Sequence, residues 1–126
     1  MLEEECNIII DTSSILFGFT YNKDIFELVK ISYPNCKIII SKGIIRELKN
    51  IAKSTGKRGV YAKTALEAIK HKDINIVNDN NIVDEWIYKY AQSIDAKVVT
   101  NDTELYKRLK DLSIKCMKMT VSGNIK

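Results

Sequence analysis

Short apolar runs alternate with stretches of helical periodicity along this chain, and that alternation constrains its fold more than any other feature. Apolar runs bounded by polar residues predict strands buried on both faces, here at residues 6–10, 36–40, 74–77, 96–100 and 113–119. Apolar residues spaced three and four apart predict helices at about 24–31, 42–53, 60–71, 82–94 and 103–111, the first after an irregular turn around 18–22. Strands that alternate with single helices form a parallel sheet with right-handed crossovers. We therefore expect an α/β fold, a three-layer α/β/α sandwich with a central parallel sheet of four or five strands.

The composition and length are those of one ordinary folded domain over residues 1–126. Apolar residues make up 45% of the chain and charged residues 29%, which is unlike a disordered segment. No apolar run approaches the roughly 20 residues of a membrane span, and the acidic start at residues 3–5 does not resemble a signal peptide. We expect residues 1–5 and 120–126 to be loose tails.

The cysteines indicate a reducing compartment. Cys6, Cys36 and Cys116 are odd in number, lack CxxC spacing and fall in apolar segments. Buried, reduced thiols in a cytoplasmic protein are the expected state of such a set. The single histidine, His71, lies in a lysine-rich stretch, so a histidine-based metal site or a Ser-His-Asp catalytic group is disfavoured.

The formal net charge of +4 is unevenly distributed. Residues 53–73 carry six basic and two acidic side chains, and residues 106–126 carry six and one. Residues 74–105 reverse this balance, with six acidic and two basic side chains. Basic blocks that flank an acidic one suit a polyanionic ligand whose chemistry takes place at carboxylates. The structural alternative is a set of solvated, lysine-rich helix faces.

Four carboxylates follow the predicted strands. Asp11 and Asp102 come directly after two of them, and Asp84 lies in the first turn of the helix over 82–94. Glu47 shares the apolar side of the helix over 42–53. Each has an ordinary alternative, because the aspartates are also at capping positions and Glu47 can pair with a neighbouring base. Since the carboxyl ends of parallel strands meet at one edge of a sheet, we expect the four to converge.

Converging carboxylates have a definite chemistry. They repel one another, so they either take raised pKa values or bind a cation. Oxygen ligands without histidine or cysteine select Mg²⁺ or Mn²⁺. Such an ion can activate a water and neutralise charge on a scissile phosphate. The hydroxyls of Ser13 and Thr100 lie beside Asp11 and Asp102 in the sequence, where they could orient the carboxylates.

Four segments together resemble the PIN-domain family of metal-dependent ribonucleases: IIIDTSS, IIRELKN, VDEWIYKYA and VVTNDTEL. The family pattern is an Asp after the first strand, an acid in a following helix, an Asp before an x-x-Ile-x-x-x-Ala helix, and T-x-D after a strand. It matches Asp11, Glu47, Asp84 and Asp102 in order, over essentially the whole chain. The resemblance implies a PIN-type sandwich that hydrolyses RNA endonucleolytically with Mg²⁺ or Mn²⁺, these four residues being catalytic and binding the metal. A further acid of some members falls at Glu104.

Two branches of the family compete. VDEWI and TNDTELYKRL are similar to archaeal relatives of a small-subunit rRNA-processing PIN protein, more than to VapC-like toxins. That branch implies an enzyme of rRNA processing or RNA quality control that acts on RNA such as an rRNA precursor. The toxin branch implies a ribonuclease inhibited by an antitoxin protein, and a third alternative is a catalytically silent PIN-like module that binds RNA or protein. Homodimers are frequent in the family, and no membrane is implied.

A receiver-type phosphorylation switch is a rival class of protein, but it requires paired acids after the first strand, and Asp11 has no acidic neighbour.

Basic and aromatic residues near the acidic segments are candidates for RNA binding. Tyr88 and Tyr106 could stack on bases, although tyrosines on amphipathic helices more often pack internally. The candidates for phosphate contact lie near the flexible connection at 54–59 and on the helix that follows Asp102: Lys53, Lys57, Arg58, Lys107, Arg108 and Lys110.

Overall fold

The computed structural model describes residues 6–80 and 82–126. Within them, five parallel strands form one sheet, as the alternating pattern predicts. Their order across the sheet is β3-β2-β1-β4-β5. The elements in chain order are β1 (Cys6–Ile10), α1 (Thr12–Thr20), α2 (Ile25–Ser32), β2 (Cys36–Ser41), α3 (Lys42–Ala52), α4 (Lys57–Lys70), β3 (Ile74–Val77), α5 (Val83–Ile94), β4 (Lys97–Val99), α6 (Thr103–Asp111) and β5 (Cys116–Met117).

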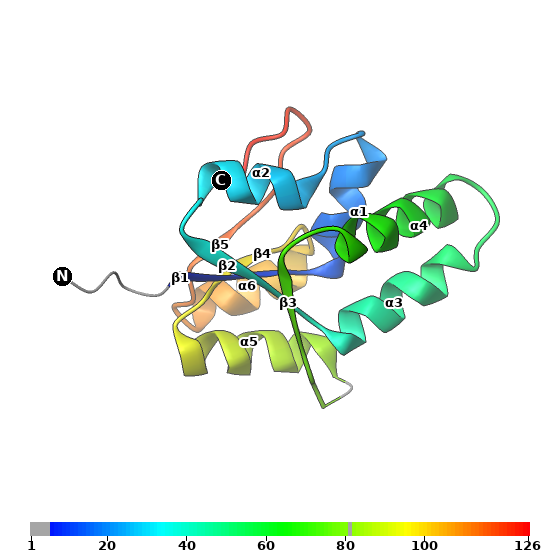
Figure 1. Ribbon diagram of the computed structural model, residues 1–126. Helices are drawn as coiled ribbons and strands as arrows, with labels where there is room; N and C mark the ends of the chain where they lie inside the picture. Colours follow the sequence, from blue (N-terminus) through cyan, green and yellow to red (C-terminus); the bar gives the residue numbers. More distant parts are fainter. Residues whose placement is uncertain (1–5, 81) are drawn as a thin grey trace.

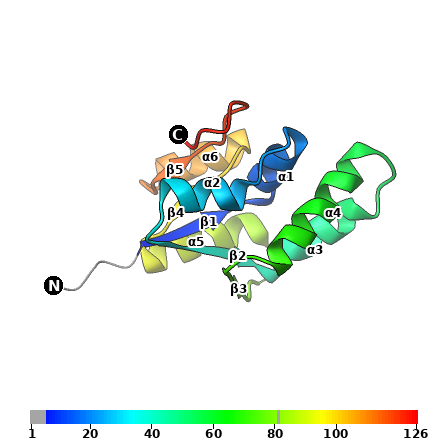
Figure 2. The same cartoon turned by 45° about the horizontal axis from the view of Figure 1, so that its top comes forward.

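The helices form two layers around the sheet, which confirms the three-layer α/β/α sandwich. Helices α1, α2 and α4 cover one face and α5 and α6 the other, while α3 packs along α4 as a projecting hairpin (Figures 1 and 2). After β3 the chain crosses back past β2 and β1 to form β4. The neighbours β1 and β4 are therefore followed by connections that leave in opposite directions. Such a switch point opens a crevice at the carboxyl ends of the strands.

Isoleucine and valine fill the centre of the sheet. Ile8–Ile10, Ile38–Ile40, Val98 and Val99 are all buried, as expected for strands covered by helices on both faces. On α5, Trp86, Ile87 and Ala91 are buried, in agreement with the helical periodicity of that segment.

The segment after β1 is more regular than the sequence suggests. The turn expected around 18–22 is limited to Tyr21 and Asn22, because α1 continues through Thr20. Threonine, serine and glycine are weak helix formers, but Ser14 and Gly18 are buried. Ser14 Oγ donates to Asn101 Oδ1 at 2.6 Å, and Gly18 lies against Met119 and the start of α2. A Cβ at Gly18 would lie 2.9 Å from the Lys23 carbonyl oxygen. Tertiary packing therefore outweighs local propensity here.

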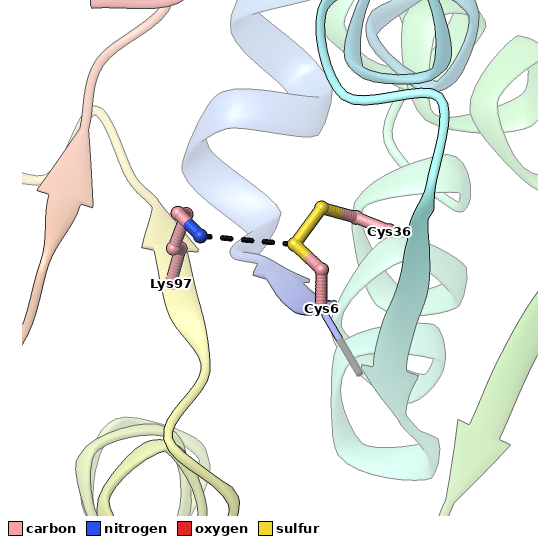
Figure 3. Close-up of a disulfide and its surroundings, with 3 residues drawn as sticks. All are labelled: Cys6, Cys36 and Lys97. Carbon is pink, nitrogen blue, oxygen red and sulfur yellow. Dashed lines mark hydrogen bonds between the residues drawn. A yellow bond between two sulfur atoms is a disulfide. The ribbon is translucent and has the colours of Figure 1, made fainter. Parts of the chain in front are cut away.

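The prediction of reduced thiols is wrong for two of the three cysteines. Cys6 and Cys36 are register partners at the start of β1 and β2, and they form a disulfide with a Cα–Cα distance of 4.4 Å (Figure 3). The Lys97 ammonium lies 3.7 Å from Cys6 Sγ. Cys116 is free and buried, as expected. The pairing was missed because strand register is a property of the sheet, and cysteines thirty residues apart give no local sign of it.

The loose tail expected at residues 120–126 is also wrong. Backbone hydrogen bonds join Lys118 and Lys126 in both directions, at 2.9 Å each, and an antiparallel bridge links Met119 to Ile125. The Asn101 side chain accepts from Met119 N at 3.1 Å and donates to its carbonyl at 2.9 Å. This side chain therefore ties the start of the terminal hairpin to the loop after β4. The other expected tail, residues 1–5, lies outside the described residues.

In the part of the chain that the structure describes, no helix combines the length and apolar character needed to cross a membrane.

Candidate active site

Asp11 lies directly after β1, with only 5% of its surface exposed. Its Oδ2 accepts hydrogen bonds from Ser13 Oγ at 2.8 Å and Thr100 Oγ1 at 2.9 Å. No hydroxyl of the described residues donates to Oδ1, and the side chain does not cap α1. Burial raises the pKa of Asp11, hydrogen bonds from the two hydroxyls and from the Thr12 backbone oppose that rise, and the charge of Asp102 adds to it. Asp11 is thus a rigidly held carboxylate with one oxygen free of side-chain donors.

The hydroxyls predicted to support the site link the ends of β1 and β4. Ser13 Oγ and Thr100 Oγ1 lie 3.2 Å apart. The backbone N–H of Asn101 donates to Ser13 Oγ at 3.0 Å, and that of Asp102 donates to Thr100 Oγ1 at 3.1 Å. Each hydroxyl therefore accepts from the loop after β4 while donating to Asp11. This network fixes the carboxylate relative to the start of α6.

Glu47 and Asp84 face Asp11 from the helices α3 and α5. Glu47 Oε1 accepts from Thr12 Oγ1 at 3.2 Å. Partial burial raises the pKa of Glu47, and the charges of Asp11 and Asp84 raise it further. Partial burial and the charges of Asp11 and Asp102 likewise raise the pKa of Asp84. Both side chains remain open to solvent and line the same hollow between α3 and α5. We call the region where these carboxylates and Asp11 influence one another the cleft.

Asp102 has two roles in the structure. Its Oδ1 accepts from Leu105 N at 3.0 Å and so caps α6, while its charge acts on Asp11 and Asp84. The alternatives of cap and site member are therefore compatible. Glu104 differs, because the charges that raise the pKa of Asp84 are those of Asp11 and Asp102, with none from Glu104. The predicted four acids influence one another at the carboxyl edge of the sheet, and their catalytic roles stay a prediction.

The four acids do not form a closed metal cage. Among the described residues, no three acidic, histidine or cysteine side chains are placed to hold one ion together. The donor set nevertheless fits a hydrated hard cation, because Mg²⁺ keeps several waters and is commonly bound by one or two carboxylates. Oδ1 of Asp11, to which no side chain of the described residues donates, is an available donor, and Glu47, Asp84 and Asp102 would complete the shell directly or through water.

Asp79 is a structural carboxylate that sequence reasoning missed. Its Oδ2 accepts from Gly43 N at 2.9 Å, at the start of α3, and its Oδ1 pairs with Arg46 at 3.2 Å. A methyl group at Gly43 would overlap the Asp79 carboxylate and would lie 2.8 Å from Val83 Cγ2. Gly43 thus allows the loop before α5 to approach α3, which sets where α5 begins. The run 78–81, rich in capping residues, was the only signal in the sequence.

Replacing Gly43 with alanine is expected to destabilise the protein by about 1–3 kcal/mol, the usual range for overpacking. The displaced Val83 is next to Asp84, so cleavage activity should fall as well. Thermal unfolding and cleavage assays measure the two effects. Gly56→Ala is the control, because a Cβ at Gly56 would meet no atom within 4 Å and the φ of that residue is 97°. The strain at Gly56 is local, so that variant should lose stability and keep activity. Equal activity of Gly43→Ala and the natural protein would contradict this role.

The predicted basic residues lie in two places. Lys57 and Arg58 are in the first turn of α4 rather than in a flexible connection, and Lys53 caps the end of α3. These three lie toward the tip of the projecting α3–α4 hairpin (Figure 1). The other three, Lys107, Arg108 and Lys110, are on α6, as predicted.

Two hollows meet at Asp84. One of about 500 Å³ lies between α3 and α5 and is also lined by Glu47. The other, of about 280 Å³, lies between α5 and α6 and is lined by Tyr88 and Arg108; we call it the α5–α6 hollow. Exposed Ile82 borders both. The carboxylate cleft therefore continues to both sides of Asp84.

The match to known proteins agrees with this arrangement. Residues 8–120 match the family described as PIN like domain. The chain belongs to the PIN-like domain family. The match spans from β1 to the start of the terminal hairpin and includes all four acids of the cleft. No curated protein matches the sequence.

Several solved structures share this PIN-like fold. The PIN domain endonuclease Utp24 is similar with a TM-score of 0.73 and 23% identity, over 90% of this chain and 85% of that chain. A domain of a functionally unknown protein from Methanocaldococcus jannaschii gives a TM-score of 0.67 and 18% identity, over 91% of both chains. VapBC-1 from nontypeable Haemophilus influenzae gives a TM-score of 0.61 and 16% identity, over 89% of this chain and 97% of that one. At these identities the likeness shows the fold.

Proposed function

We propose that this PIN-like protein is a metal-dependent endoribonuclease that hydrolyses RNA phosphodiesters at the cleft formed by Asp11, Glu47, Asp84 and Asp102. The observation that carries the proposal is electrostatic. The strongest charge effects on the pKa values of Asp11, Glu47 and Asp84 come from other carboxylates. Carboxylates arranged in this way are stabilised by a cation, and a protein that only needed to fold would gain nothing from their repulsion.

Each residue of the cleft has a distinct task in this proposal. A bound Mg²⁺ or Mn²⁺ would neutralise charge on the scissile phosphate and lower the pKa of a water. Asp11, held by Ser13 and Thr100, would bind the ion through Oδ1. Asp84 and Asp102 would hold it from α5 and α6. Glu47 is oriented by Thr12, and its raised pKa suits it to accept a proton from the attacking water.

Metal should stabilise the protein in a pH-dependent way. With EDTA present, the free energy of unfolding should fall as pH rises above the ordinary carboxyl range. Raised pKa values mean that these carboxyls lose their protons at a higher pH in the folded protein than in the unfolded chain, so deprotonation favours the unfolded chain. Mg²⁺ or Mn²⁺ at about 100 times its Kd should restore about 2.7 kcal/mol at neutral pH. Differential scanning fluorimetry with and without EDTA measures both effects. Asp84→Asn should weaken the pH dependence and the metal response, and an undiminished metal response in that variant would contradict the assignment.

Cleavage of RNA is the direct test. Single-stranded and structured RNA should be cut internally with Mn²⁺ or Mg²⁺ and left intact with EDTA. Equal cleavage with and without EDTA would contradict metal dependence, and no cleavage of any RNA would favour a catalytically silent module that binds RNA or protein.

Within this activity we place the protein in rRNA processing or RNA quality control, in the cytoplasm. The likeness to Utp24, together with VDEWI and TNDTELYKRL, supports this branch. The likeness to the VapBC structures supports the alternative of a toxin ribonuclease bound by an antitoxin. Growth arrest on expression, relieved by a small protein encoded alongside, would favour the toxin. Size-exclusion chromatography tests the proposed homodimer.

A further inference from the structure

The α5–α6 hollow next to Asp84 has a composition that the proposed hydrolysis does not require. Its floor contains buried Leu105, and its rim carries Ile82, a large apolar side chain with 59% of its surface exposed. Its volume of about 280 Å³ is just below the range of about 300–1,000 Å³ that drug-sized ligands occupy. The size therefore suits one planar ring.

Charge argues against a phosphate in this hollow. Three carboxylates line it, those of Asp84, Glu85 and Glu104, against one cation, Arg108. Glu85 pairs with Lys89, whereas Glu104 makes no hydrogen bond or ion pair within the described ranges. A phosphate would be repelled here, but carboxylates accept hydrogen bonds from the amino groups of bases.

Tyr88 and Arg108 both line the hollow and contact each other there. The guanidinium carbon of Arg108 lies 5.1 Å from the centroid of the Tyr88 ring, within the range of cation–π contacts. Tyr88 packs partly against the core, and Arg108 is exposed. The ring therefore holds the guanidinium in place from below. A guanidinium plane is a stacking surface for unpaired bases.

Tyr106 provides a comparison within the same chain. Like Tyr88 it is partly buried against the core and carries cations over its ring, with Lys110 at 5.3 Å and Lys118 at 4.4 Å. Tyr106 does not line the hollow. Ammonium groups also lack the planar surface of a guanidinium. The two tyrosines that sequence reasoning treated alike thus differ in position and partner.

We propose that the α5–α6 hollow binds one nucleobase of a single-stranded RNA, next to the scissile phosphate, stacked on the guanidinium of Arg108 with Tyr88 beneath it. The inference rests on the proposed function for the identity of the polymer. Arg108 then recognises a base instead of a phosphate. Glu104 accepts from an amino group, so adenine and cytosine are preferred to uracil, which has none.

Binding of short oligo(A), oligo(C), oligo(U) and an abasic strand of equal length tests this inference by fluorescence anisotropy with Mg²⁺, in Asp11→Asn protein that leaves RNA intact. Tyr88→Ala removes the ring that holds the guanidinium in place, so it should weaken binding of oligo(A) and oligo(C) by up to the fivefold to hundredfold, roughly, that one stacking contact is worth. Tyr88→Phe keeps the ring and should retain binding. Arg108→Lys keeps the positive charge and loses the planar guanidinium, so it should weaken binding of base-bearing strands only. Binding of the abasic strand should be unaffected by each change.

Tyr106→Ala is the matched control and should leave binding of every strand unchanged. The inference is overturned if Tyr88→Ala leaves binding unchanged as Tyr106→Ala does, or if no strand binds. It is also overturned if Arg108→Lys weakens binding of the abasic strand as much as binding of the other strands. Cleavage by otherwise natural protein separates the two proposals. RNA cleavage that is unaffected by Tyr88→Ala and by Arg108→Lys removes the base site alone. Absent cleavage with the expected binding pattern removes the nuclease and keeps the base site.

Discussion

Asparagine in place of Asp11 is expected to lower metal-dependent RNA cleavage by about a thousandfold or more, since an ion bound at such a site supplies several kcal/mol of transition-state stabilisation. The change is nearly isosteric. The amide oxygen can still accept from Ser13 and Thr100, which both donate to Oδ2 of the natural residue. The amide NH₂ then replaces Oδ1, and a donor cannot bind a cation.

Rates of single-turnover cleavage with saturating Mn²⁺ measure this effect. The matched control is Asp111→Asn, at the exposed end of α6 and away from the cleft, which should cleave RNA at the natural rate. Thermal unfolding of both variants shows whether the fold is kept. Because removal of a buried charge relieves a group with a raised pKa, Asp11→Asn should be at least as stable as the natural protein in EDTA at neutral pH. Natural cleavage rates in a folded Asp11→Asn variant would exclude Asp11 from the site.

Reduction of the Cys6–Cys36 disulfide is expected to lower the free energy of unfolding by about 3–4 kcal/mol. The two cysteines are thirty residues apart, and the loss of loop-closure entropy in the unfolded chain gives a value of this size. The disulfide lies at the amino ends of β1 and β2 (Figure 3), and the acids lie at the opposite, carboxyl edge. Cleavage well below the unfolding temperature should therefore change little.

Denaturant unfolding with and without a reducing agent measures the loss, and Cys36→Ser should reproduce it without reductant. Cys116→Ser is the control, because that buried thiol is unpaired and its replacement should leave a response to reductant. Thiol titration of the unfolded, unreduced protein should find one free thiol. Three free thiols would contradict the disulfide.

The order of strands and helices was predictable because it depends on local patterns. β-branched runs bounded by polar residues predict buried strands, and the clear periodicity of α5 predicts which face Trp86 and Ile87 bury. The position of Asp11 after its strand depends only on such boundaries. The resemblance on which the four acids were chosen also uses residues close to strand ends.

What the sequence did not reveal depends on contacts between distant residues. Strand register pairs Cys6 with Cys36, and Asn101 fixes the terminal hairpin through Met119. The α1 helix exists because its weak helix formers are buried against other parts of the fold, such as Asn101 and Met119, which no window of sequence contains. The same holds for Tyr88 and Tyr106, whose sequence surroundings are alike and whose partners differ. Local pattern determined the elements of this protein other than α1, and the edge of the sheet at which its acids gather. Tertiary packing decided which side chains meet there, because the free energies of those contacts come from residues far apart in the chain.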